Sequence, residues 1–104
     1  MEKKLLPIGT IVQLFEDDVK IIIAGYCPTG TARPGYIWDY SGFPFPLGYR
    51  KPDEILQFDH EQIETIYAMG YQDAEQFTFM EQLEGVAAKL KNGEESEEGG
   101  MDNV

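Results

Sequence analysis

Residues 10–26 read TIVQLFEDDVKIIIAGY, two runs of β-branched and apolar residues around one acidic break. Residues 10–15 and 19–26 are predicted to be strands, because β-branched side chains favour an extended backbone. The break at residues 16–18 is short enough for an antiparallel hairpin. The uninterrupted isoleucines at 21–23 indicate that the second strand is central in its sheet and covered on both faces.

Three more short strands are predicted downstream, over residues 36–40, 54–58 and 63–69. Residues 27–35, between the second and third strands, are rich in proline and glycine and are expected to form a loop. The prolines within residues 42–52 cannot donate to a sheet ladder, so this segment is expected at a sheet edge or on the surface. One helical turn with Asp59 at its N-cap is expected just before the last strand.

A helix is predicted to begin at Asp73, with Gln76 three residues later as in a capping box. Apolar residues then recur at helical spacing; they are Phe77, Met80, Leu83, Ala87 and Leu90, with Phe79 and Val86 widening the stripe. Lys89 and Lys91 lie in the last turn, and Gly93 is expected to stop the helix. This order of elements predicts an α+β fold, with a small bent antiparallel sheet or SH3-like half-barrel of about five strands and one C-terminal amphipathic helix.

The composition indicates one globular α+β domain over residues 1–91 and an acidic disordered tail over residues 92–104. The 104 residues carry a net charge of −11, and residues 1–91 alone carry −6, because the tail holds five acidic residues and no basic one. Such a surface repels nucleic-acid phosphates and anionic lipids, so neither nucleic acid nor membrane is expected as a partner. A basic protein surface is the expected partner.

Cys27 is the single cysteine, which excludes an intrachain disulfide. The N-terminal residues include two lysines but no apolar h-region of an export signal. No apolar run is long enough to span a bilayer. These features predict a cytoplasmic protein.

The residue types that carry chemistry are few. His60, the only histidine, is flanked by Asp59 and Glu61, but sequence neighbours in an extended chain do not converge on one point, so a turn residue is favoured over a general base or metal ligand. Cys27 is interpreted as a structural thiol, because it lacks a neighbouring base. We therefore expect no catalytic residue, no cofactor and no metal site, and a protein that is not an enzyme.

The segment at residues 38–49, WDYSGFPFPLGY, is the densest in aromatic side chains. Two interpretations are open: an aromatic minicore that closes one end of the barrel, or an exposed anchor for a protein partner, since rigidly held aromatics form binding hot spots. The predicted partner contacts are Trp38, Tyr40, Phe43, Phe45 and Tyr49.

The order of several motifs resembles a small domain of unknown function from Gram-positive bacteria that is often encoded beside type VII secretion effectors of the LXG class. The resemblance covers residues 5–80 and rests on LPIGTIV (6–12), IIIAG (21–25), DYSGFPFPLG (39–48), FDHEQI (58–63) and GYQDAE (70–75). It implies a cytosolic accessory protein, such as a chaperone or targeting partner of a secreted toxin.

Two other functions remain as alternatives. One is a small-molecule-binding or enzymatic domain that uses the loop from Cys27 to Gly35 and nearby aromatics. The other is a structural homo-oligomer, built by pairing of edge strands or by the apolar stripe of the helix. The oligomeric state is left open by the sequence.

Overall fold

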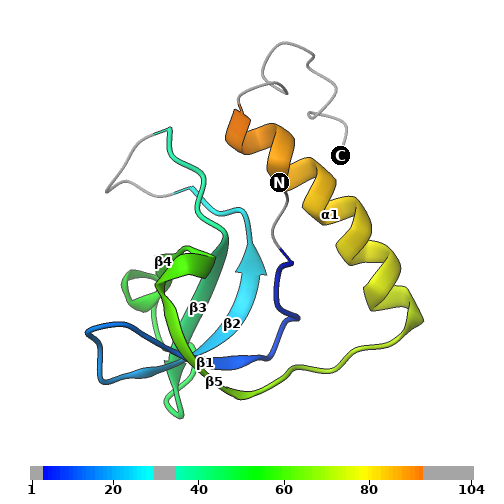
Figure 1. The fold of residues 1–104 in the computed structure, drawn as a ribbon. Helices are drawn as coiled ribbons and strands as arrows, with labels where there is room; N and C mark the ends of the chain where they lie inside the picture. Colours follow the sequence, from blue (N-terminus) through cyan, green and yellow to red (C-terminus); the bar gives the residue numbers. More distant parts are fainter. Residues whose placement is uncertain (1–3, 30–34, 93–104) are drawn as a thin grey trace.

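The computed structural model describes residues 4–29 and 35–92 (Figure 1). These described residues form one five-stranded antiparallel sheet, one α-helix and two single-turn 3-10 helices. The elements are β1 (Ile11–Leu14), β2 (Lys20–Tyr26), β3 (Tyr40–Phe45), η1 (Pro52–Glu54), β4 (Leu56–Phe58), η2 (His60–Gln62), β5 (Ile63–Ala68) and α1 (Ala74–Asn92). The predicted α+β class is confirmed. The expected helix stop at Gly93 and the expected acidic tail, apart from Asn92, lie outside the described residues.

The hairpin of β1 and β2 forms as predicted, with Val12 opposite Ile21 and Gln13 opposite Lys20. β2 is the middle strand in the order β4-β3-β2-β1-β5, as expected. The expected coverage of both faces is wrong, because Ile21 and Ile23 are buried whereas Lys20 and Ala24 on the opposite face are exposed. One face of this antiparallel sheet is covered and the other is open, a common arrangement for such sheets.

The sheet is bent because its two edge strands are joined by a very short connection. β4 and β5 lie at opposite edges, yet only residues 59–62 separate them. Across a flat five-stranded sheet the edges would lie about 19 Å apart, at about 4.8 Å per strand. The single turn η2 rises only about 6 Å. The edges must therefore curve toward each other, as Figure 1 shows.

The third strand begins later than predicted. Residues 36–39 lie outside the sheet, where Ile37 makes only an isolated bridge to Thr29, and β3 runs from Tyr40 to Phe45. β3 begins where Tyr40 pairs with Tyr26 of β2. Within the strand, Gly42 approaches β2 closely, since a Cβ at Gly42 would lie 2.5 Å from the Ile22 carbonyl oxygen. Pro44 is tolerated because β4 pairs with β3 only as far as Gly42, which leaves an edge beyond it.

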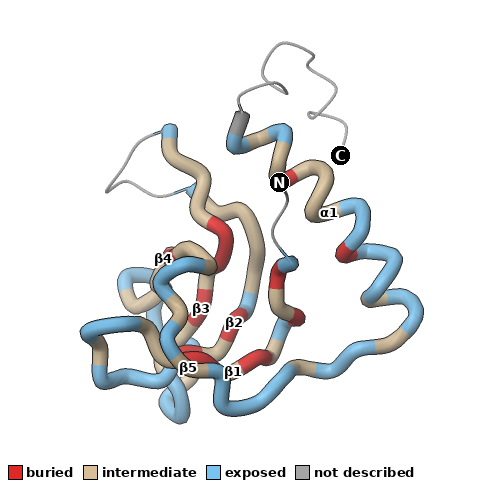
Figure 2. The backbone as a smooth tube through the Cα atoms, viewed as in Figure 1, coloured by how far each residue is buried: buried red, intermediate tan, exposed pale blue. Residues whose placement is uncertain are grey.

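The core lies between the inner face of the sheet and α1, with residues 5–7 passing between them (Figures 1 and 2). Its buried apolar members are Leu5, Val12, Ile21, Ile23, Tyr40, Phe58, Met80 and Ala87. The Leu5 N–H donates to Glu84 of α1 at 2.9 Å, and the Leu6 N–H donates to the Tyr40 hydroxyl at 3.0 Å. The N-terminal segment thus attaches the helix to the sheet.

α1 begins as predicted, with the Gln76 N–H donating to the Asp73 carboxylate at 2.9 Å. The apolar stripe of this helix divides into two parts. Met80 and Ala87 are buried against the core, whereas Phe77 and Phe79 are 56% and 50% exposed. The stripe is therefore wider than the surface that the rest of the domain covers.

Candidate functional site

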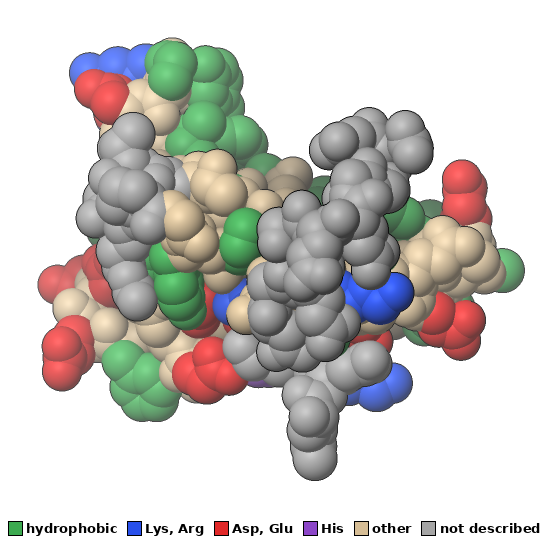
Figure 3. Space-filling model, turned by 90° about the horizontal axis from the view of Figure 1, so that it is seen from above, with side chains coloured by type: hydrophobic (Ala, Val, Ile, Leu, Met, Phe, Trp, Pro, Cys, Tyr) green, Lys and Arg blue, Asp and Glu red, His purple; other side chains and the backbone are tan. Residues whose placement is uncertain are grey.

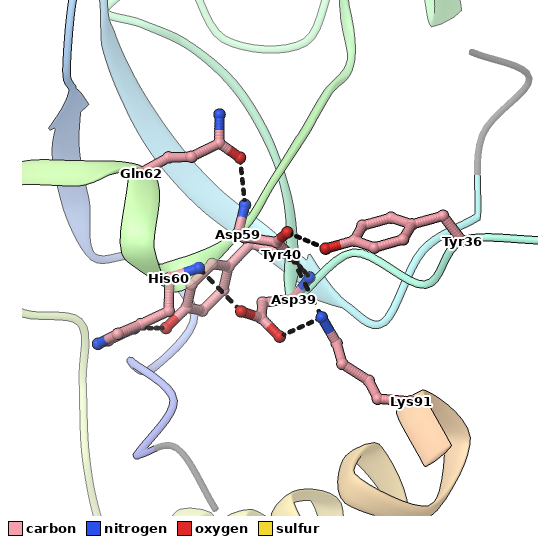
Figure 4. Close-up of polar contacts among 7 residues, drawn as sticks. All are labelled: Tyr36, Asp39, Tyr40, Asp59, His60, Gln62 and Lys91. Carbon is pink, nitrogen blue, oxygen red and sulfur yellow. Dashed lines mark hydrogen bonds and ion pairs between the residues drawn. The ribbon is translucent and has the colours of Figure 1, made fainter. Parts of the chain in front are cut away.

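The most concentrated polar arrangement lies at the C-terminal end of α1 (Figure 4). We name it the latch. It consists of Tyr36, Asp39, Asp59, His60 and Lys91. The residues come from three places: the segment before β3, the η2 turn between β4 and β5, and the last turn of the helix.

Lys91 connects the helix to two carboxylates of the sheet. Its Nζ lies 3.0 Å from Asp39 and 3.3 Å from Asp59. The Asp39 side chain is only 3% exposed. It also accepts the His60 N–H at 2.8 Å, while the Asp39 N–H donates to Asp59 at 2.9 Å. Partial burial lowers the pKa of Lys91, but its interactions with Asp39 and Asp59 outweigh burial and raise that pKa overall.

Aromatic groups surround this ion pair. The Tyr36 hydroxyl donates to Asp59, and the Lys91 ammonium lies 5.2 Å from the centre of the Tyr36 ring, within cation–π range. Asp59 lies at the N-cap of η2, as predicted, and its N–H donates to the Gln62 side chain at 2.8 Å. The Asp59 carboxylate is therefore shared between the ring hydroxyl, a backbone N–H and the ammonium.

Tyr40 links the latch to the N-terminal segment. Its hydroxyl lies 2.7 Å from Nδ1 of His60 and accepts the Leu6 N–H. Donation of the hydroxyl proton to Nδ1 corresponds to a neutral imidazole protonated on Nε2. Burial raises the pKa of Tyr40. The Tyr26 hydroxyl donates to the Leu6 carbonyl, and burial raises the pKa of Tyr26 to about 12. Both phenols are therefore neutral across the physiological range.

Cys27 lies beside the latch, and its backbone has a left-handed φ of 54°. Burial raises the pKa of its thiol; Asp39 adds to this rise and Lys91 opposes it. A thiol with a raised pKa carries little thiolate at neutral pH and is a weak nucleophile. The loop from Cys27 to Gly35, which the small-molecule alternative uses, includes residues 30–34 outside the described part of the chain.

The geometry suits the latch to holding elements together. Its carboxylates accept hydrogen bonds from the segment before β3 and from the η2 turn, and they form ion pairs with Lys91 of the helix. Within residues 4–29 and 35–92, no group of three His, Cys, Asp or Glu side chains is placed to hold a metal ion. His60 lies in a turn, as interpreted from the sequence, but its bond to Tyr40 was not foreseen. No local pattern pointed to it, because the partners are distant in sequence.

The predicted aromatic contacts divide into two groups. Tyr40 is fully buried in the core, so its prediction as a partner contact is wrong. Trp38 is half-buried and packs edge-on against Tyr36, with ring centroids 4.8 Å apart. These two residues belong to the latch end of the sheet.

Phe43, Phe45 and Tyr49 lie toward the other end of β3. The Phe43 and Tyr49 rings meet at 5.3 Å, and Phe45 and Tyr49 are 38% and 55% exposed. Leu47, which was not among the predicted partner contacts, is 59% exposed. Tyr40 is therefore core, whereas Phe45 and Tyr49 face solvent and stay predicted partner contacts. Figure 3 views the molecule from above, whereas this turn lies at the bottom of Figure 1, and it shows hydrophobic, acidic and basic side chains together on the upper face.

A family model described as "Domain of unknown function (DUF4176)" matches residues 5–79. The match includes all five strands and the first turns of α1. No curated protein and no solved structure matches the chain. None of the helices in the described part of the chain has the length and apolar character needed to cross a membrane.

Proposed function

The chain belongs to the DUF4176 family, a domain of unknown function, and we propose that it is a non-enzymatic protein-binding module. The observation that carries this proposal is the turn after β3. The large apolar side chains of Phe45, Leu47 and Tyr49 are exposed there, and none of them belongs to the core cluster. Exposed aromatics on a defined backbone are typical of protein-binding hot spots.

The backbone of this turn is held in place. Gly48 has a φ of 76°, a left-handed conformation that glycine adopts readily, and its N–H donates to the Pro44 carbonyl at 2.7 Å. The following Arg50 forms two hydrogen bonds with Glu54, at 3.0 and 2.9 Å. A backbone that is already ordered loses less conformational entropy on binding, which favours recognition by this turn.

The finer proposal is that the module is a cytoplasmic chaperone or targeting partner of a type VII secreted effector. Its support is the resemblance of residues 5–80 to domains encoded beside LXG effector genes. The net charge of −11 supports a basic protein partner over nucleic acid or an anionic membrane.

The test is affinity capture of the tagged chain from its native host, read by mass spectrometry. We expect one stoichiometric partner with wild type, and its loss with the double variant Phe45→Ser/Tyr49→Ser. Phe77→Ser is the matched control, because Phe77 is 56% exposed on α1, away from the turn. Recovery of the folded bait alone would contradict the proposal, and light scattering and ligand-induced thermal shifts would then test the oligomer and small-molecule alternatives.

A further inference from the structure

We infer that the β1–β2 turn joins the turn after β3 in one docking surface, and that this surface takes a basic, apolar segment of a partner protein. We name it the turn surface; it consists of Phe15, Val19, Phe45 and Leu47. The inference rests on the proposed function and deepens it, because it adds a second turn to the contact and states the chemistry of the partner.

Strand register brings the two turns to the same end of the sheet. Lys20, the first residue of β2, is directly opposite Phe45, the last residue of β3. Val19 immediately precedes Lys20 and Pro46 immediately follows Phe45, so the turn before β2 and the turn after β3 lie at the same end of the sheet. Figure 1 shows the β1–β2 turn at the left of the sheet and the turn after β3 at its bottom, both away from the C-terminal end of α1.

All four side chains of the turn surface are exposed and none belongs to the core cluster. Their exposed fractions are 58% for Phe15, 43% for Val19, 38% for Phe45 and 59% for Leu47. Turn positions are normally occupied by small or polar residues that solvent accepts readily. Four large apolar side chains at one end of the sheet therefore indicate a surface that a partner covers.

Hydrogen bonds hold the β1–β2 turn in a defined shape. The Val19 N–H donates to the Asp17 carboxylate at 3.1 Å, and the Gln13 amide donates to the Asp17 carbonyl at 2.7 Å. The Phe15 N–H donates to the Gln62 carbonyl at 2.9 Å, which attaches the turn to η2. Phe15 and Val19 are thus presented on an ordered backbone, which lowers the entropy cost of docking.

The charges around the turn surface are mainly negative. Glu16 and Asp18 are exposed between Phe15 and Val19. Glu61 and Glu64 are exposed as well. They lie near the β1–β2 turn, because Leu14 at the end of β1 pairs with Ile63 at the start of β5.

The nearby cations are Lys20, Arg50 and Lys51, which is exposed next to Arg50. Lys20 lies 5.1 Å from the Tyr67 ring centre, and Arg50 is paired with Glu54 at 2.9 Å. An apolar centre with an acidic surround fits a partner segment that combines apolar side chains with Lys or Arg. A second copy of this chain would bring the same negative charges and be repelled.

The probe is a random peptide-display library, selected on the immobilised full chain. We expect the enriched peptides to combine Leu, Phe or Trp with Lys or Arg, and their affinity to fall as salt is added. Phe15→Ser should weaken binding of a synthetic enriched peptide by about tenfold or more, the effect of a hot-spot residue. Asp18→Lys should weaken it as well.

Phe77→Ser and Glu81→Lys on α1 are the controls, since both side chains are exposed and belong to neither turn. Thermal melting of each variant checks that the fold is intact. The inference is overturned if no peptide is enriched, if enriched peptides lack basic residues, or if Phe15→Ser binds as wild type does. If the host partner is still captured and still lost with Phe45→Ser/Tyr49→Ser, the proposed function stands and the contact is confined to the turn after β3.

Discussion

Lys91 in the last turn of α1 lies 3.0 Å from the carboxylate of Asp39, which directly precedes β3 and is almost completely buried. The pair connects the end of the helix to the start of a strand. A buried carboxylate is costly unless it is paired and hydrogen-bonded. The docking of α1 and the placement of β3 therefore depend on each other.

The first prediction concerns this ion pair. Lys91→Met keeps the alkyl chain but removes the charge, which leaves Asp39 buried with fewer partners. We expect the free energy of unfolding to fall by about 1–3 kcal/mol, measured by urea denaturation. Lys89→Met is the matched control in the same helical turn and should change stability by less than about 0.5 kcal/mol, because Lys89 is exposed. Equal losses for the two variants would show that the latch does not attach the helix.

The second prediction is a loss of stability in alkaline solution. The pKa of Tyr26 is raised from 10.0 to about 12, and those of Tyr40 and Lys91 are also raised. The folded state therefore holds protons that the unfolded state releases once the pH passes the ordinary pKa of tyrosine. The stabilisation is complete below about pH 10 and is lost as the pH rises through the folded values. Urea midpoints measured from neutral pH upward should fall across this window, and a flat profile would contradict the account.

The third prediction compares two glycines. A Cβ at Gly42 would lie 2.5 Å from the Ile22 carbonyl oxygen and 2.7 Å from Cγ2 of Ile21, and the carbonyl belongs to the sheet backbone. Gly42→Ala should destabilise the domain by about 1–3 kcal/mol. Gly85→Ala in α1 meets nothing within 4 Å and should instead stabilise it by about 0.5–1 kcal/mol. Thermal melting of both variants checks the opposite signs, and destabilisation by both would show that α1 is packed differently.

Local signals in the sequence predicted much of the fold. The β1–β2 hairpin follows from two β-branched runs and a short acidic break, and α1 follows from the Asp73 cap and the helical spacing behind it. These features act within a few residues. The bent sheet also follows once four residues are seen to connect its two edges.

Long-range contacts account for the features that local patterns in the sequence did not predict. β3 begins where Tyr40 pairs with Tyr26 of β2, a register that aromatic content does not encode, so the strand was placed too early. Tyr40 and Tyr49 have the same side chain, yet one is core and the other is 55% exposed. Phe15 joins Phe45 at one end of the sheet only through the pairing of β2 with β3. Sequence separation conceals each of these relationships.

The fourth prediction is that the apolar side chains after β3 bind a partner protein. The captured partner should be purified and titrated into the wild-type chain, the double variant Phe45→Ser/Tyr49→Ser and the control Phe77→Ser by calorimetry. We expect the double variant to bind at least about a hundredfold more weakly, which corresponds to about 2.8 kcal/mol for two hot-spot residues. The control should bind as wild type does. Unchanged affinity in the double variant, with its fold intact, would contradict the account.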